Sequence, residues 1–186
     1  MFALHRFRSR FAAIALGITV GILPSVSWAQ STPYITDKDL QVAVRTFSFV
    51  YDLPKGDIEI EIIYNPNNAV SSNEASQLNK IIAQGIVFAA RTLKAKMVPV
   101  SEMGSTGSRF AYITHGLQSD YGVLMERARN RQILTFSTDF QCVDSQKCVM
   151  GMTADPNIKI EISRTAAAAS KLEFSQALKL MVREVE

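Results

Sequence analysis

Apolar positions recur along the chain with two spacings, and these spacings predict helices and strands in alternation. Apolar residues at helical spacing follow Thr36-x-x-Asp39 and Ser71-x-x-Glu74, both of which have the form of a helix-capping box. We expect helices over 36–50, 71–89, 121–128 and 175–185, with an alanine-rich helical turn over 163–170. Runs of β-branched and aromatic residues predict strands at 58–64, 97–100, 110–114, 133–137, 149–153 and 158–162.

Helices that alternate with strands are typical of a largely parallel sheet that is covered by helices on both faces. The turn sequence at 155–157 separates the last two predicted strands and favours an antiparallel hairpin there. No repeat, low-complexity tract or change of composition marks a second domain. The pattern predicts one α/β domain over residues 30–186, a three-layer Rossmann-like sheet that is mostly parallel with a C-terminal antiparallel hairpin.

The N-terminal segment has a different pattern, typical of a secretory signal peptide. Arg6, Arg8 and Arg10 precede an uncharged apolar run at 11–23, and Ser27 and Ala29 are small residues placed for cleavage. The run is shorter than the roughly 20 residues that a membrane-spanning helix needs. We therefore expect residues 1–29 to be removed after Ala29 and the protein to act outside the cytoplasm, with an uncleaved anchor as the alternative.

The charge of the chain changes once this segment is removed. The whole chain has 20 Lys and Arg against 17 Asp and Glu, but residues 1–29 hold three arginines and no acid. Residues 30–186 therefore carry equal numbers of basic and acidic side chains. Bulk charge gives no support for a nucleic-acid partner. The basic run of Arg127, Arg129 and Arg131 is better explained as the solvated end of a helix.

Two cysteines, Cys142 and Cys148, both lie in the exported part. In an oxidising compartment a pair this close in sequence favours a structural disulfide. A metal site and a redox couple are the alternatives. Zinc would need four ligands, although His115 is the only histidine after residue 29, and the spacing differs from that of Cys-x-x-Cys oxidoreductases. We predict the disulfide, no metal and no cofactor.

The remaining polar motifs indicate no enzyme class. The loop at 104–108 is rich in glycine and serine, but it lacks the lysine and the following helix of a phosphate-binding P-loop, and a flexible loop is expected. His115 follows a predicted strand, where α/β proteins often place functional groups, yet no nucleophile elbow accompanies it. Glu59 and Glu61 are interpreted as the polar face of their strand rather than as a glycosidase pair.

Several segments in this order resemble the YfiR/HmsC-like family of periplasmic proteins, over nearly all of residues 30–186. The matching segments are FVYDLP at 49–54, the strand and turn at 58–66, ILTFSTD at 133–139, CVMGM at 148–152, IKIEIS at 158–163, the alanines at 166–169 and the helix at 175–180. The chain departs from the family pattern at Leu53, where a tryptophan is usual, at Lys147 and Cys148, which replace two glycines, and at Ser163, which replaces an asparagine.

The resemblance implies a periplasmic, non-enzymatic regulator. Such proteins bind the periplasmic part of an inner-membrane diguanylate cyclase and hold it inactive, and redox state can release that hold. The motifs carry over Thr135, Ser137, Glu161 and Ser163 as candidate partner- or ligand-binding residues, and Cys142–Cys148 as a disulfide that tunes binding. A homodimer is left open. The alternative function is a periplasmic protein that binds small solutes, because the α/β pattern and the export signal fit that class as well.

Overall fold

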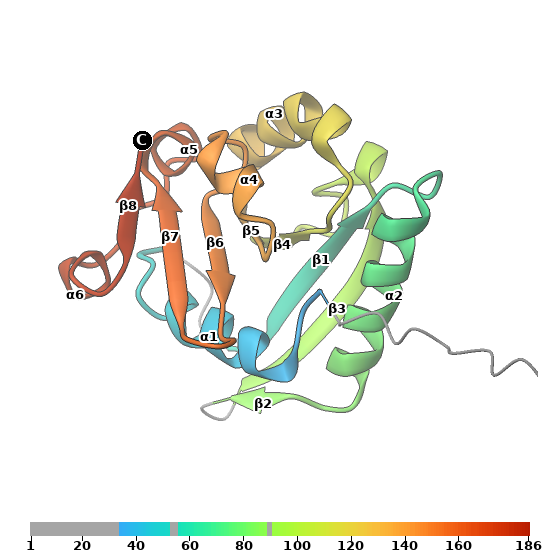
Figure 1. Ribbon diagram of the computed structural model, residues 1–186, viewed down its shortest axis with the longest axis horizontal. Coiled ribbons are helices and arrows are strands. Elements are labelled where there is room, and N and C mark those ends of the chain that lie inside the picture. Colours follow the sequence, from blue (N-terminus) through green and yellow to red (C-terminus); the bar gives the residue numbers. More distant parts are fainter. Residues whose placement is uncertain (1–33, 53–55, 89–90) are drawn as a thin grey trace, which may run out of the picture. The chain divides into compact units, whose positions relative to one another are not determined.

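The computed structural model describes residues 34–52, 56–88 and 91–186. The predicted signal peptide with its cleavage site, the turn at 53–55 and Ala89 of the predicted second helix lie outside these residues. Within them, eight strands form one sheet in the order β2-β3-β1-β4-β5-β6-β7-β8 (Figure 1). The strands are β1 Ile58–Tyr64, β2 Val87–Phe88, β3 Arg91–Pro99, β4 Phe110–Ile113, β5 Leu134–Ser137, β6 Met150–Thr153, β7 Lys159–Ser163 and β8 Arg183–Val185.

The predicted α/β fold with a mostly parallel sheet is confirmed. Strands β3, β1, β4, β5 and β6 are parallel neighbours. The expected C-terminal hairpin is the antiparallel pair of β6 and β7, in which Met150 lies opposite Ile162. A second antiparallel pair, β2 with β3, closes one edge, and β8 extends the other edge parallel to β7.

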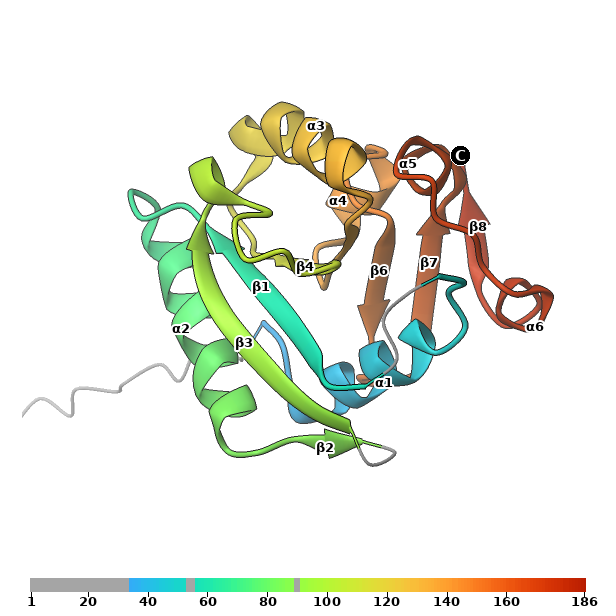
Figure 2. The same cartoon turned by 180° about the vertical axis from the view of Figure 1, so that it is seen from behind.

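Helices pack on both faces of this sheet and produce two apolar cores (Figures 1 and 2). The larger core contains residues of α1 (Asp37–Phe47) and α2 (Ala69–Ala83), together with residues of α5 (Arg164–Ala169) and α6 (Gln176–Lys179). The smaller core contains residues of α3 (Tyr121–Arg131) and α4 (Phe140–Asp144). Phe136 and Tyr112 of the larger core are fully buried and make an edge-to-face ring contact.

Local chemistry accounts for the helix starts, although one predicted cap was wrong. The box of Thr36 and Asp39 caps α1 as expected, but α1 ends at Phe47 rather than near residue 50. The cap of α2 is Asn68, not Ser71, because the Asn68 side chain accepts from the amides of Val70 and Ser71. Ser71 and Glu74 therefore lie inside the helix, and their side chains are free to make other contacts.

The sequence pattern missed strands β2 and β8, and it predicted only the last part of β3. Strand β3 begins at Arg91, six residues before the predicted start at Met97. Its exposed Lys94 and Lys96 alternate with Leu93 and Ala95, which is a strand pattern that the sequence prediction overlooked. At the C-terminus, Ser175 caps a helix as predicted, but α6 ends at Lys179 and the chain continues as β8. Met181 was expected to face inward and is instead 62% exposed.

Candidate functional site

The order of the strands places a switch point between β1 and β4. The chain leaves β1 through α2 towards β3 on one side, and it leaves β4 through α3 towards β5 on the other. In open α/β sheets, ligands bind beyond the carboxyl ends of the strands at such a point. We call the segments 65–68, 114–118 and 138–139, which follow β1, β4 and β5, the carboxyl edge.

Hydrogen bonds join the segments after β1 and β4 across this switch point. The Asn65 side chain donates to the Asp120 carboxylate over 3.1 Å. The Asn68 side-chain amide donates to the Gly116 carbonyl over 3.0 Å. The hydroxyls of Ser71 and Thr114 are 2.6 Å apart and buried. Gly116 has φ of 78°, and a Cβ there would lie 2.7 Å from the Asn68 side chain, so only glycine fits. The polar groups at the switch point are therefore bonded to one another.

Glu74 is the centre of a second network at the same edge. Its side chain is fully buried, and it accepts from the Tyr112 hydroxyl over 2.5 Å and from the His115 backbone amide over 2.7 Å. The His115 Nδ1 lies 3.0 Å from both carboxylate oxygens. The Tyr112 hydroxyl also contacts the Thr138 hydroxyl at 2.9 Å. The network thus links α2 to the segments after β4 and β5.

The environment shifts the pKa values of two of these groups. Burial, together with the charge and hydrogen bond of Glu74, raises the pKa of Tyr112 well above its usual range, so its hydroxyl stays a donor. At His115, burial lowers the pKa, but the hydrogen bond and charge of Glu74 and the charge of Asp139 outweigh it. The pKa of His115 is raised as a result, which favours the imidazolium paired with Glu74.

This arrangement orients His115 through its Nδ1. A buried carboxylate on Nδ1 is how enzymes fix a histidine that acts through Nε2. Among the described residues, however, no serine or threonine hydroxyl is hydrogen-bonded to His115, and both cysteines form a disulfide. Because the capping-box motif assigned Glu74 to a helix start, its pairing with His115 was not predicted from the sequence. The described residues also contain no group of three or more His, Cys, Asp or Glu placed to hold a metal ion.

The four predicted partner- or ligand-binding residues are buried, and their polar side chains make internal bonds. Thr135 accepts from the Val149 amide, Ser137 donates to the Ile113 carbonyl, and Ser163 caps α5. Glu161 accepts from Lys159 and Arg183 on the surface above it. The structure places Thr135, Ser137, Glu161 and Ser163 on β5 and β7, on either side of β6. Their role in binding stays a prediction.

The predicted disulfide between Cys142 and Cys148 is present, with Cα atoms 5.1 Å apart. Cys142 is 1% exposed and Cys148 is fully buried, and both belong to the smaller core. Cys142 lies on α4, a helix that the sequence pattern did not predict, and its carbonyl accepts from the amides of Lys147 and Cys148. The disulfide therefore fixes the connection from α4 to β6 from within the core.

Replacing both cysteines by alanine should lower the free energy of unfolding by about 2 kcal/mol, since a short loop loses its cross-link in the unfolded chain. The folded, unreduced protein should show no thiol that can be alkylated, as measured by mass spectrometry. Because the sulfurs are buried, dithiothreitol should reduce the bond only after local unfolding. Two reactive thiols in the folded protein, or reduction as fast as in denaturant, would contradict this.

Glu61 has a role that the alternation on β1 did not indicate. It was expected on the polar face with Glu59, but it is fully buried. Its carboxylate accepts from the amides of Gly104 and Thr106, over 2.6 and 2.9 Å, and from the Thr106 hydroxyl over 2.6 Å. The glycine-rich loop expected to be flexible is therefore bound to the sheet, and an internal carboxylate occupies the amide groups that a phosphate would need.

Two arginines in the C-terminal half of α3 donate hydrogen bonds to the start of the same loop. Arg127 donates to the Met103 carbonyl and Arg131 to the Gly104 carbonyl. The α3 helix ends at Arg131, which is exposed along with Arg129. The basic run thus lies at a helix end, as predicted.

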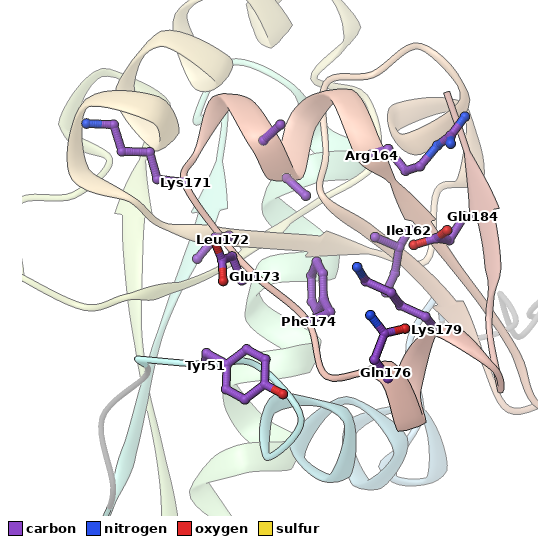
Figure 3. A pocket seen from close by; sticks show the side chains of 12 residues that line it. Tyr51, Ile162, Arg164, Lys171, Leu172, Glu173, Phe174, Gln176, Lys179 and Glu184 are labelled. Carbon is purple, nitrogen blue, oxygen red and sulfur yellow. The ribbon is translucent and has the colours of Figure 1, made fainter.

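A groove of about 840 Å³ lies beside β7 and β8 (Figure 3). Its buried apolar residues are Ile162, Ala167, Leu172 and Phe174. Tyr51 and the charged side chains of Lys171, Glu173, Arg164, Lys179 and Glu184 surround them, as Figure 3 shows. The groove is therefore lined by buried apolar residues and by charged side chains of both signs.

Of the four most exposed large apolar side chains in the described residues, Tyr51 lines this groove, and Leu180 and Met181 follow its lining residue Lys179. Leu180 is 88% exposed, Ile158 66%, Met181 62% and Tyr51 54%. Leu180 and Met181 connect α6 to β8, between the groove residues Lys179 and Glu184. Ile158 immediately precedes β7, the parallel neighbour of β8, so it lies at the same end of the strand pair. We call Tyr51, Ile158, Leu180 and Met181 the C-terminal apolar surface.

No family model matches the sequence, and no curated protein matches it. Among solved structures, the chain is similar to a conserved domain protein from Vibrio cholerae O1 biovar El Tor, with a TM-score of 0.54 and 14% identity over 79% of this chain and 60% of that chain. It is also similar to a ligand-free, open structure of a substrate-binding protein with adhesive properties from Clostridium difficile, with a TM-score of 0.57 and 11% identity over 81% of this chain and 59% of that chain. The chain thus spans less than two thirds of either protein, and at these identities the likeness is one of fold.

In the described residues, no helix has the length and apolar composition required to span a membrane.

Proposed function

We propose that residues 30–186 form a periplasmic, non-enzymatic regulator that binds the periplasmic part of an inner-membrane protein of the diguanylate cyclase type and holds it inactive. The C-terminal apolar surface is the observation that carries this proposal. Exposed apolar groups gathered at one place are characteristic of protein interaction sites. Here Tyr51 lines the groove, and Leu180 and Met181 directly follow its lining residue Lys179.

Two further features support a binding role without catalysis. The switch point, where this class of fold binds small ligands, has its polar groups engaged by each other through Asn65, Asn68 and Ser71. The resemblance to the YfiR/HmsC-like motifs favours the same role, and the motif at 175–180 leads into the C-terminal apolar surface. The buried disulfide favours a structural role, so redox tuning would require the smaller core to open.

Deleting the gene should raise cellular cyclic-di-GMP and biofilm, and complementation with the wild-type gene should reverse both. Complementation with Leu180→Asp should fail, because a charge would be placed in the C-terminal apolar surface. Val123→Asp is the matched control, since Val123 is 48% exposed on α3, outside this surface. Unchanged cyclic-di-GMP after deletion would contradict the proposal, and full activity of Leu180→Asp would contradict the surface assigned to it.

A second candidate is a small-solute-binding protein, which the likeness to a substrate-binding protein and the size of the groove favour. A thermal-shift screen with small metabolites separates the two candidates. A solute present at 100 times its dissociation constant would stabilise the fold by roughly 2.7 kcal/mol. Our leading proposal predicts no such shift.

A further inference from the structure

The His115 ring lies between a buried carboxylate and an aromatic residue at the start of the folded domain. Its Nδ1 faces Glu74 of α2, and its ring is 4.7 Å from that of Tyr34, with an angle of 37° between the planes. Tyr34 is 42% exposed and is followed by the buried Ile35 and by Thr36, the cap of α1. His115 thus joins the first described residues to the carboxyl edge.

The ionisable groups around His115 come from every element packed on it. Glu74 belongs to α2, Asp139 to the segment after β5, Tyr112 to β4, and Tyr34 to the N-terminal segment. Both charges that act on the imidazole are negative. The protonated ring is therefore the positive charge that compensates the buried Glu74, and it also attracts the face of Tyr34.

We propose that His115 is a pH-responsive clasp that holds Tyr34 against the Glu74 network when the imidazole is protonated and loosens it when the proton is lost. Without the proton, Glu74 loses its compensating charge and the ring loses its cationic attraction to Tyr34. The proposal is independent of any partner of the C-terminal apolar surface, which lies on other elements.

The direction of the pH dependence follows from the raised pKa of His115. The stabilising effect of the pair is fully present below the ordinary histidine value of about 6.5. It is lost as pH rises through the higher value that His115 has in the folded domain. The clasp therefore closes in mildly acidic surroundings and opens in alkaline ones.

The composition of the exported part allows a direct test. Trp28 and His5 lie in the predicted signal peptide, so the mature protein has no tryptophan and His115 as its one histidine. A Tyr34→Trp variant then carries a single tryptophan at the clasp, which can be excited selectively over the remaining tyrosines. Because Tyr34 is already 42% exposed, quenching by acrylamide should increase by up to about twofold between pH 5.5 and 8.5 as the cationic contact is lost. The midpoint should lie above 6.5 and coincide with the His115 titration measured by NMR.

Three variants keep the test decisive. Tyr51→Trp, at a tyrosine that is 54% exposed and lines the groove, should show no such pH dependence. Tyr34→Trp combined with His115→Gln should be quenched strongly at both pH values. Tyr34→Trp combined with Glu74→Gln should move the midpoint down, which also serves if the His115 variant does not fold. Quenching that stays constant while His115 titrates, or that changes equally without His115, would overturn the proposal.

Discussion

Replacing Glu74 by alanine is expected to lower the free energy of unfolding by about 3–5 kcal/mol, the range for breaking a buried ion pair by removing one partner. The reason lies in what the carboxylate leaves behind. The Tyr112 hydroxyl, the His115 amide and the His115 imidazole all bond to it, and these groups are buried or partly buried. Urea unfolding of the purified mature protein, followed by circular dichroism, measures the difference.

Glu126→Ala is the control, because Glu126 is exposed on α3 and its loss should change stability by at most about 0.5 kcal/mol. Glu74→Gln should fall between the two, since it keeps an acceptor for Tyr112 but removes the charge opposite His115. A loss below about 1 kcal/mol in Glu74→Ala would mean that the network at the carboxyl edge does not stabilise the fold.

The second large effect is expected at Glu61. Replacement by alanine leaves the Gly104 and Thr106 amides and the Thr106 hydroxyl without their acceptor, at about 2–4 kcal/mol in total. The loop at 104–108 should also become sensitive to proteolysis, because its amides hold it to β1 through this carboxylate.

Glu59→Ala provides a matched comparison, two residues earlier on the same strand. Glu59 is exposed, so its replacement should change the free energy of unfolding by at most about 0.5 kcal/mol. Both measurements use the same urea titration, and limited proteolysis follows the loop. Equal effects at Glu59 and Glu61, or an intact loop in Glu61→Ala, would contradict the assigned role.

These two glutamates illustrate where sequence patterns succeed and where they fail. The period of two on β1 correctly predicts the strand, and helical spacing correctly predicts α2. Each pattern assigns Glu61 or Glu74 to a local role, on a polar face or in a cap. In the structure, each carboxylate instead accepts hydrogen bonds from residues more than 35 positions away in sequence. Such pairs depend on tertiary packing, which no local spacing records.

The ends of the sheet were harder to predict for a different reason. Edge strands can be short and bury little apolar surface: β2 has only two residues and β8 only three. The apolar positions in KLMVREV, residues 179–185, fit the spacing of a helix as well as that of a strand. The pairing of β8 with β7 favours the strand. The disulfide, by contrast, was predictable, because two cysteines in an exported chain leave few alternatives.

The candidate site was likewise predictable from the sequence only in part. The position of His115 after a strand was visible in the sequence, whereas its partner Glu74 and its contact with Tyr34 were not. The C-terminal apolar surface was missed because Met181 was expected to pack inward on a longer helix. Exposure of apolar residues is a property of the folded chain, and their pattern alone favours burial.

The proposed regulation is tested most directly by isolating the tagged mature protein together with solubilised inner-membrane proteins and identifying what accompanies it by mass spectrometry. Recovery of an inner-membrane diguanylate cyclase with the wild type and with Val123→Asp, and its loss with Leu180→Asp, is the predicted result. Failure to recover any such cyclase with the wild-type protein would contradict the proposed function.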